Sequence, residues 1–398
     1  MKKKNLLVRV GLFFAILILG TMVAMAVGET TGLALADLSS TTVDTIINDA
    51  ANHTLFATLD EKGIYRSNDA GYSWQMISSG PSDAIVKTLA IHPLDQMTLY
   101  ASTVDQSGHG SLWLSKDGGE HWTALPLDLP TSDQETSPVI NTIAIDSNAP
   151  EMLYLGTEGQ GLYRFDLTTN QAEQIGSNPR MQELYVRDFD ISSSGDIYAV
   201  TTEGLMVVDG TSMHSLEHVP DTPVSIAIDP VNPQRLYVGT VAYGVFTSHD
   251  GGQSWQALNA GFGWQPGVML RVSAVTVDED KPQHLAVATA YSVGSQLIGD
   301  GIYESFNAGQ HWIKIAEHED VVDQLVIQGG GIYAATTQGL VRYGNPLPGA
   351  SLTSSLHFNS LANPTAVQIL ILAITAAIAG WVLLGKVSGR SYQNQTAI

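Results

Sequence analysis

The strongest constraint on the fold is a segment that recurs seven times between Thr45 and Tyr343. Each copy has a run of β-branched and aromatic residues, a turn, a second run that ends in small residues, a glycine and a third run. The glycine before the third run marks the copies, at steps of 38 to 57 residues: Gly63, Gly110, Gly161, Gly204, Gly244, Gly301 and Gly339. Short runs of this composition, separated by Asp-Pro, Asn-Pro and Gly-Gly pairs, are typical of β-strands joined by tight turns.

Seven such units predict a closed ring of small sheets. One sheet of three or four strands cannot bury both of its faces, whereas radially arranged sheets cover one another and protect their edges. We therefore predict an all-β fold, a seven-bladed β-propeller over residues 37–350. Six or eight blades remain alternatives, because a strand from one end must complete the last blade. Both Leu33–Ser39 and residues 355–358 are candidates for that strand.

The two ends of the chain have the pattern of membrane segments. Residues 1–36 have three lysines directly after Met1 and an apolar run at 6–27, which is typical of a signal peptide or signal anchor. Residues 24–26 and 34–36 both have the small-x-small form of a cleavage site. Residues 364–385 are uncharged and long enough to span a bilayer as a transmembrane helix, after a linker at 351–363.

Charge predicts where each part lies. Basic residues flank both apolar runs, including Lys386 and Arg390 in the tail 386–398, so the positive-inside rule places both ends in the cytoplasm. The propeller is then on the extracytoplasmic side of the cell membrane, with one C-terminal span, or two if the leader is kept. Residues 37–363 hold 12 basic and 38 acidic residues, a net charge of −26. This excludes a general nucleic-acid binder, because phosphate neutralisation requires Lys and Arg.

Four of the seven copies carry a second motif after the third run. Its form is Ser-x-Asp-x-Gly-x-x-Trp, with asparagine in place of aspartate in the last copy. The motif residues are Ser67, Asp69, Gly71, Trp74, Ser115, Asp117, Gly119, Trp122, Ser248, Asp250, Gly252, Trp255, Ser305, Asn307, Gly309 and Trp312. Ser and Asp side chains can bond local backbone N–H groups, the glycine suits a positive φ, and the tryptophan would bury apolar surface between blades. We expect a structural role, without catalysis or metal binding, because Asn307 can still accept the turn hydrogen bond.

This motif resembles the Asp-box, or BNR repeat, of sialidases, sortilin-type receptors, xyloglucanase-like glycosidases and photosystem II assembly/stability factors. The resemblance runs from Thr45 to about Tyr343 and implies the propeller fold without fixing an activity. The similarity to assembly/stability factors implies a scaffold that matures or holds a membrane complex. The Phe/Tyr-Arg-Ile-Pro segment that a sialidase resemblance implies is absent, as is the Cys-rich region of a sortilin-type receptor, since the chain has no cysteine.

One loop is a candidate binding surface. Phe262 and Trp264 are flanked by Gly and Pro after the Asp-box of the fifth copy. Exposed aromatic side chains on such a loop could form a binding hot spot. The alternative is that they fill space between blades, and the sequence does not separate these two interpretations.

Charged residues near the middle of the chain are candidates for the central channel. Arg187, Asp188 and Asp190 form the densest charged cluster on a predicted strand, and Glu158 and Glu203 follow second runs, where loops can face the channel. A glycosidase needs two carboxylates across a pocket. The alternative is a set of solvated loop charges and local ion pairs.

No sequence motif indicates a cofactor. The chain lacks a P-loop, a dinucleotide fingerprint and a nucleophile elbow, and its histidines do not cluster as metal ligands do. We therefore predict a membrane-anchored, non-catalytic scaffold that binds a protein partner or a membrane complex. The alternative is a cell-surface glycosidase or glycan-binding protein of the Asp-box type.

Overall fold

The computed structural model describes residues 33–344, except 40, 50–51, 60–62, 79, 82–83, 128, 130–136, 177–183, 264–268 and 294–295. Contacts divide the chain into Met1–Asn345 and Pro346–Ile398, and every described residue belongs to the first unit. The predicted leader up to residue 32, the linker, the transmembrane helix and the tail lie outside the described residues. Among the residues that are described, no helix is long and apolar enough to cross a membrane.

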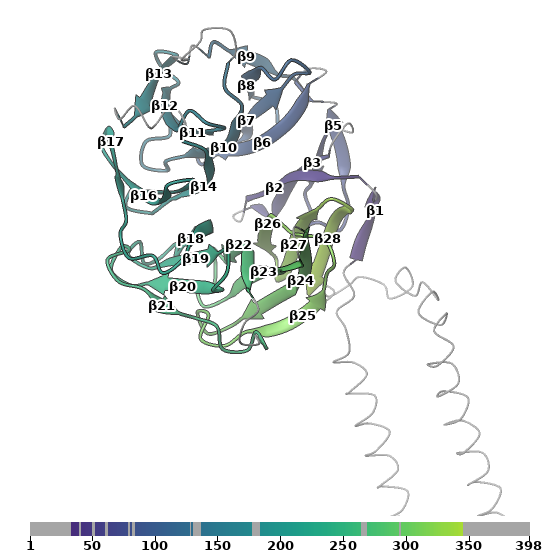
Figure 1. Cartoon of the computed structure of the whole chain (residues 1–398). Helices are drawn as coiled ribbons and strands as arrows, with labels where there is room; N and C mark the ends of the chain where they lie inside the picture. The colour runs from purple at the N-terminus through teal and green to yellow at the C-terminus, as the bar shows by residue number, and fades with distance from the viewer. Residues whose placement is uncertain are drawn as a thin grey trace, which may run out of the picture. The chain divides into compact units, whose positions relative to one another are not determined.

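The described residues form seven four-stranded antiparallel sheets arranged as a wheel (Figure 1). Blades 1 to 4, each from its innermost strand outward, contain β2 (Val43–Asp49), β3 (Thr54–Leu59), β4 (Gly63–Ser67) and β5 (Gln75–Ser78); β6 (Ile85–His92), β7 (Asp95–Val104), β8 (Gly110–Ser115) and β9 (Thr123–Leu125); β10 (Ile140–Ile145), β11 (Met152–Thr157), β12 (Leu162–Asp166) and β13 (Gln171–Ile175); β14 (Val186–Ile191), β15 (Ile197–Thr201), β16 (Gly204–Asp209) and β17 (Ser212–Ser215).

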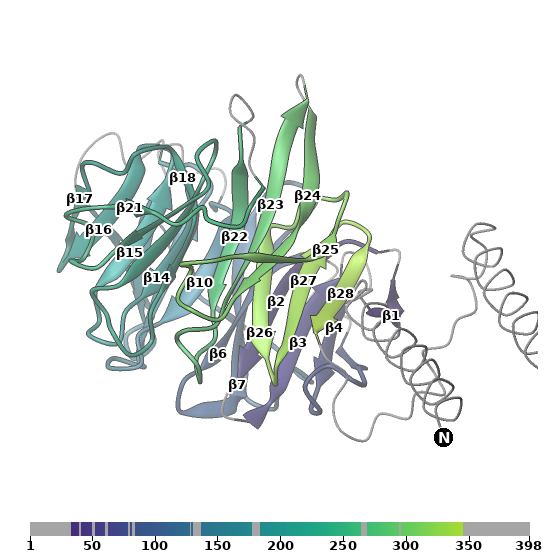
Figure 2. The ribbon, with the colours of Figure 1, turned by 90° about the horizontal axis from the view of Figure 1, so that it is seen from below.

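Blades 5 to 7 follow the same order. They contain β18 (Pro223–Ile228), β19 (Leu236–Thr240), β20 (Val245–Ser248) and β21 (Gln256–Ala257); β22 (Arg271–Val277), β23 (Leu285–Val293), β24 (Gln296–Ser305) and β25 (Ile313–Glu317); β26 (Gln324–Gln328), β27 (Gly331–Thr336), β28 (Gly339–Gly344) and β1 (Leu33–Ser39). Figure 2 shows the β23–β24 hairpin of blade 6 extending past the strands of its neighbours. The predicted all-β propeller and its count of seven blades are confirmed.

The ring is closed by a strand from the N-terminal side. β1 pairs antiparallel with β28, with Leu33 opposite Arg342 and Ala34 opposite Val341. Blade 7 therefore combines one strand from the start of the described chain with three from its end. Of the two candidate closing strands, the structure selects Leu33–Ser39, while residues 355–358 lie outside the described part.

The core is divided among the interfaces between blades. The described residues form seven apolar clusters, and each cluster joins two adjacent blades. Between blades 5 and 6, for example, Tyr237 packs with Val272, Val287 and Trp312, all of them buried. Burial of apolar area at every interface is the main force that holds the sheets in a ring, because each sheet contributes both faces to the core.

The glycine that marks each unit has a local physical reason. At Gly339 the backbone adopts φ +127°, a region that side chains with a Cβ rarely enter. At Gly301 a Cβ would lie 2.3 Å from the carbonyl oxygen of Ala316 on β25, so the strand pairing itself requires glycine there. The repeated glycine is therefore required by the turn geometry in one blade and by the close approach of two strands in another.

Candidate functional site: the central cavity

The Asp-box motifs form tight turns between the third and fourth strands of their blades. The Ser67 hydroxyl donates to Asp69 Oδ1 at 2.7 Å and accepts the Gly71 N–H at 2.7 Å. Asp69 also accepts the Ser73 N–H at 2.9 Å and the Ser73 hydroxyl at 2.6 Å. In the other three motifs the serine hydroxyl likewise accepts a hydrogen bond from the glycine N–H, at 2.7 to 3.0 Å. The turn occupies the aspartate oxygens, and the motif residues do not line the central cavity.

The four motif tryptophans differ in burial. Trp312 is 1% exposed, whereas Trp74, Trp122 and Trp255 are half-buried. The indole N–H of each half-buried tryptophan donates within its own turn, as Trp255 Nε1 does to the Gly252 carbonyl at 3.1 Å. Trp312 Nε1 instead donates to the carbonyl of Leu258, in blade 5, at 2.7 Å. Only this indole among the four therefore links two blades through a hydrogen bond to a backbone carbonyl.

The aromatic loop after blade 5 contributes to packing. Phe262 is 5% exposed, and its ring stacks on that of Trp312 at 5.4 Å between centroids. It also meets the edge of Tyr303 at 5.0 Å. Of the two interpretations of this loop, the structure favours filling of space between blades for Phe262. Trp264 lies outside the described residues.

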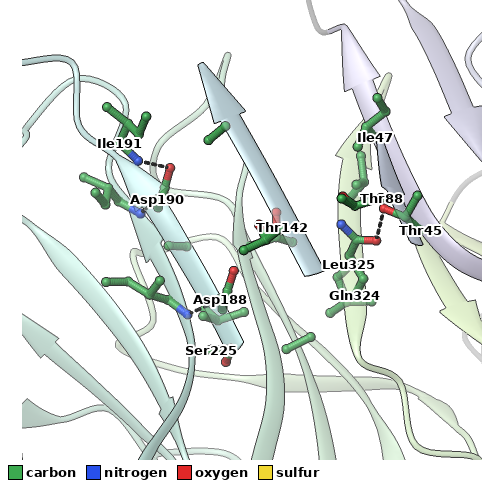
Figure 3. A pocket seen from close by; sticks show the side chains of 18 of the residues that line it. Thr45, Ile47, Thr88, Thr142, Asp188, Asp190, Ile191, Ser225, Gln324 and Leu325 are labelled. Carbon is green, nitrogen blue, oxygen red and sulfur yellow. Dashed lines mark hydrogen bonds between the residues drawn. The ribbon is translucent and has the colours of Figure 1, made fainter. Parts of the chain in front are cut away.

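A cavity of about 1300 Å³ lies at the centre of the wheel and is lined by the innermost strands of all seven blades (Figure 3). Strand β14 brings three of the sequence-predicted residues into its lining, Arg187, Asp188 and Asp190. Glu158 and Glu203 are exposed on loops outside this lining. Glu203 instead lines a smaller cavity of about 430 Å³ beside the blade 4–5 junction.

A β-bulge near the start of the innermost strand recurs in six blades. In blades 1 to 6 the register of this strand shifts across one residue. The bulged residues, all of which line the cavity, are Asp44, Lys87, Asn141, Arg187, Val224 and Ser273. Bulges are common next to functional sites, because the extra residue turns one side chain out of the regular alternation. Here five of the six bulged residues supply polar or charged groups to the cavity wall, and the sixth is Val224.

Further along β14, two carboxylates bridge blades 4 and 5. Asp188 Oδ2 accepts the Ile226 N–H at 3.0 Å, and Asp190 Oδ2 accepts the Ile228 N–H at 2.9 Å. Burial raises the pKa of Asp188 to about 7, with a further contribution from the charge of Asp190, and burial raises the pKa of Asp190 to about 6. Hydrogen bonds from the backbone oppose both rises. The pair therefore titrates close to neutral pH.

The acidic pair is specific to blade 4. At the register position of Asp188, the other blades place Thr45, Thr88, Thr142, Ser225, Ala274 and Gln324. Gln324, on the opposite side of the cavity in Figure 3, accepts the Ile46 N–H at 2.8 Å. A neutral amide thus makes the same kind of bridge between blades 7 and 1. The negative charge of the blade 4 pair exceeds what the bridge requires.

Two basic residues of the wall were not predicted from the sequence. Lys87 is the bulged residue of blade 2, and Arg271 precedes the bulge of blade 6, opposite Ala290 of the long β23–β24 hairpin. Burial lowers the pKa of Arg271, and the nearby charge of Arg187 lowers it further, while Asp323 acts in the opposite direction. The bulge that places Lys87 in the wall is visible only in the strand register, so no sequence pattern marked this residue.

The basic groups of the cavity are among the cations of the wheel that lie outside ion pairs. Within the described part of the chain, Lys87, Arg187 and Arg271 form no ion pair, and neither do Arg66, Lys116 and Lys281. Elsewhere, Arg164 pairs with Glu173 at 2.6 Å, and Arg235 pairs with Asp229 at 3.1 Å. Because acidic residues are in large excess in this domain, basic side chains of the cavity that form no ion pair are candidates for binding the negatively charged group of a ligand.

Among the described residues, one group of side chains has the chemistry of metal ligands. Asp117, Glu120 and His121 bring one potential ligand atom each within 4.8 Å of the others, on the Asp-box turn of blade 2. Asp117 already accepts hydrogen bonds from Ser115 and His121. The bond to the His121 backbone is the main reason that the pKa of Asp117 is lowered to about 2. These bonds account for the cluster as part of the turn.

Comparison with known proteins supports the identification of the repeat. Residues 246–257 match the family described as BNR/Asp-box repeat, and residues 34–175 match the family described as Sortilin, neurotensin receptor 3. A curated xyloglucanase, Xgh74A of Acetivibrio thermocellus, is 26% identical over 232 residues, which cover 54% of this chain and 25% of the xyloglucanase. The chain thus spans about a quarter of the length of that relative.

Two solved structures share the fold. The GH74 xyloglucanase of Xanthomonas campestris has a TM-score of 0.63 and 17% identity, over 79% of this chain and 53% of that one. The structure of YCF48 bound to D1 peptide has a TM-score of 0.58 and 15% identity, over 81% of this chain and 97% of that one. At these identities the similarity shows the fold alone. The chain is a seven-bladed propeller with BNR/Asp-box repeats, as the motif predicted.

Proposed function

We propose that the protein is a membrane-anchored, extracytoplasmic propeller that binds a protein partner without turnover and serves as a scaffold for a membrane complex. The observation that carries this proposal is the placement of the cavity carboxylates. Asp188 and Asp190 lie on one strand and both accept N–H groups of β18. A glycosidase uses two carboxylates on opposite sides of the scissile bond. The arrangement of this pair favours binding over hydrolysis. The other carboxylates that line the cavity are Asp44, Asp229, Glu279 and Asp323.

Two further observations support a scaffold. The wheel is held by apolar contacts at every blade interface, which makes it a rigid frame for loops. YCF48, which matches this chain over 97% of its own length, was solved with a bound D1 peptide. A propeller of this size can therefore hold a peptide segment. Anchoring rests on the apolar residues 364–385 and on the leader.

The test of anchoring and side is fractionation followed by protease treatment of intact cells. We expect the full chain in the membrane fraction and the propeller to be digested from outside. A chain that ends at residue 363 should leave the membrane fraction if the leader is cleaved. A full chain that resists external protease, or that stays in the soluble fraction, would overturn this part of the proposal.

The test of the scaffold role is affinity purification of the tagged full chain from a mild detergent extract. We expect one defined set of membrane proteins in stoichiometric amounts, and the same set after cross-linking in intact cells. The matched control is the tagged leader and C-terminal segment without residues 37–350. Recovery of the same proteins with this control would show that the propeller does not bind them.

The second candidate is a cell-surface glycosidase or glycan-binding protein. The 26% identity to a xyloglucanase over 232 residues favours it. Purified protein should then release product from xyloglucan oligosaccharides or fluorogenic glycosides. That activity should disappear in Asp188→Asn and Asp190→Asn if these carboxylates take part. Turnover that is sensitive to these variants would replace the scaffold proposal.

A further inference from the structure

The wall of the central cavity carries two zones of opposite charge. The first is the basic zone, Arg187 and Arg271 near the start of the innermost strands, where Lys87, Asp44 and Asp323 also line the cavity. The second is the acidic zone, which consists of Asp188 and Asp190 further along β14. All four side chains belong to the lining of the same cavity, so one ligand can meet both zones.

The two zones do not neutralise each other. No ion pair joins them within the described residues, and no cation is among the causes that set the pKa of Asp188 or Asp190. Asp323 favours the charged form of Arg271 by more than the charge of Arg187 disfavours it. Uncompensated like charges therefore lie together in the acidic zone, whereas the basic zone already contains the carboxylate of Asp323. A cation would relieve the repulsion in the acidic zone, and relief of unfavourable charge is a source of binding free energy.

The charges exceed what the architecture needs. Gln324 bridges blades 7 and 1 with an uncharged amide, whereas Asp188 bridges blades 4 and 5 with a carboxylate. At the level of Arg187, the bulge of blade 5 places the apolar Val224. Blades of the same wheel thus close their junctions without these charged groups. Charged exceptions lie on β2, β6, β14 and β22, and β14 carries three of them.

The geometry points to a ligand with both charges. We propose that the central cavity binds a small zwitterion, whose carboxylate is held by Arg187 and Arg271 and whose primary ammonium is held by Asp188 and Asp190. Strands rise about 3.3 Å per residue, so Asp188 and Asp190 follow Arg187 by about 3 and 10 Å along β14. An ω-amino acid or a short peptide with free ends has charged groups at such a separation. This site is independent of the proposed scaffold role, because it requires no protein partner.

The test uses three probes of equal length on the purified full chain, measured by isothermal titration calorimetry. 6-Aminohexanoate carries both charges, hexanoate only the carboxylate and hexylamine only the ammonium. We expect 6-aminohexanoate to bind at least about ten-fold more tightly than either single-charge probe, which corresponds to about 1.4 kcal/mol. Triglycine and N-acetyl-triglycine then separate peptide ends from free amino acids as the natural source of the zwitterion.

Matched variants assign each charge. Arg187→Gln should reduce the affinity for 6-aminohexanoate to that for hexylamine, and Asp190→Asn should reduce it to that for hexanoate. The control is Lys116→Gln, which removes an exposed cation from the Asp-box turn of blade 2 and should leave binding unchanged. Unfolding curves for every variant confirm that the wheel is intact, so that a loss of affinity reports on the site.

Three results would overturn the proposal. Equal affinity for 6-aminohexanoate and hexanoate, unaffected by Asp190→Asn, would leave only an anion site. Equal affinity for 6-aminohexanoate and hexylamine, unaffected by Arg187→Gln, would leave only a cation site. Absence of binding at about 10 mM probe, where a site with millimolar affinity would be largely filled, would exclude the zwitterion site altogether. A protein partner found by affinity purification bears on none of these outcomes.

Discussion

Replacement of Trp312 by alanine tests the idea that contacts between blades hold the wheel together. The indole is 1% exposed, stacks on Phe262 and donates a hydrogen bond to the Leu258 carbonyl across the blade 5–6 junction. Large-to-small replacements of buried aromatic residues cost about 3–5 kcal/mol, through lost transfer free energy and the cavity left behind. We therefore expect Trp312→Ala to lower the free energy of unfolding by about 4 kcal/mol.

Trp255 is the matched comparison. It occupies the same motif position in blade 5, but it is half-buried and its indole bonds within its own turn. Because Trp255 keeps more of its surface in contact with water than Trp312, Trp255→Ala should cost less, about 2 kcal/mol. Trp312→Phe keeps an aromatic ring against Phe262 and loses the N–H donor, so its cost should be about 1–2 kcal/mol.

Urea unfolding followed by fluorescence and circular dichroism measures these differences, since a shift in midpoint at constant m-value reports a change in stability. The expected order of destabilisation is Trp312→Ala, then Trp255→Ala and Trp312→Phe. Equal costs for the two alanine variants would refute the argument, because burial and the link between blades would then carry no extra stability. A Trp312→Phe variant as unstable as Trp312→Ala would also contradict it.

Three further outcomes follow from the structure. A chain that begins at Asp37 lacks two of the residue pairs between β1 and β28. Its free energy of unfolding should be about 1–3 kcal/mol lower than that of a chain that begins at residue 31, and thermal melts measure the difference. The pKa of Asp190 is raised to about 6 in the folded state, so the charged carboxylate opposes folding. Its contribution to the free energy of unfolding therefore falls as pH rises from about 4 to 7. Asp190→Asn should flatten the dependence of the urea midpoint on pH over that window. A variant with the parent slope would contradict this. Asp69→Asn should cost less than about 1 kcal/mol and Asp69→Ala about 1–2 kcal/mol, because only the amide keeps an acceptor for the turn, and equal melting temperatures would argue against this role.

The blade count could be predicted from the sequence because its determinants are local. Each marking glycine reports a turn or a close strand approach within its own unit, as Gly339 and Gly301 illustrate. The choice of closing strand could not be predicted in the same way. Pairing of Leu33 with Arg342 joins segments that are 309 residues apart in the sequence, and both candidate strands had suitable composition.

The candidate site was predicted only in part. Arg187, Asp188 and Asp190 stood out because charges are rare on strands that otherwise carry apolar and small residues. Arg271 did not stand out, because it reaches the cavity through an early start of β22 beside a hairpin that is longer than its neighbours. The bulges that raise side chains to one level of the wall are visible only in the strand register.

The pairing of β1 with β28 also sets the order of events during synthesis. The first strand of the described chain has no partner until Arg342, which is 309 residues after Leu33, has left the ribosome. At about 5–20 residues per second, that interval lasts about 15 to 60 s. Blades 1 to 6 can form as they emerge, whereas blade 7 must wait for translation to reach its end. The nascent protein therefore has an unpaired β1 edge for most of its synthesis. Chaperones or other molecules that bind unpaired strand edges can bind it during that interval.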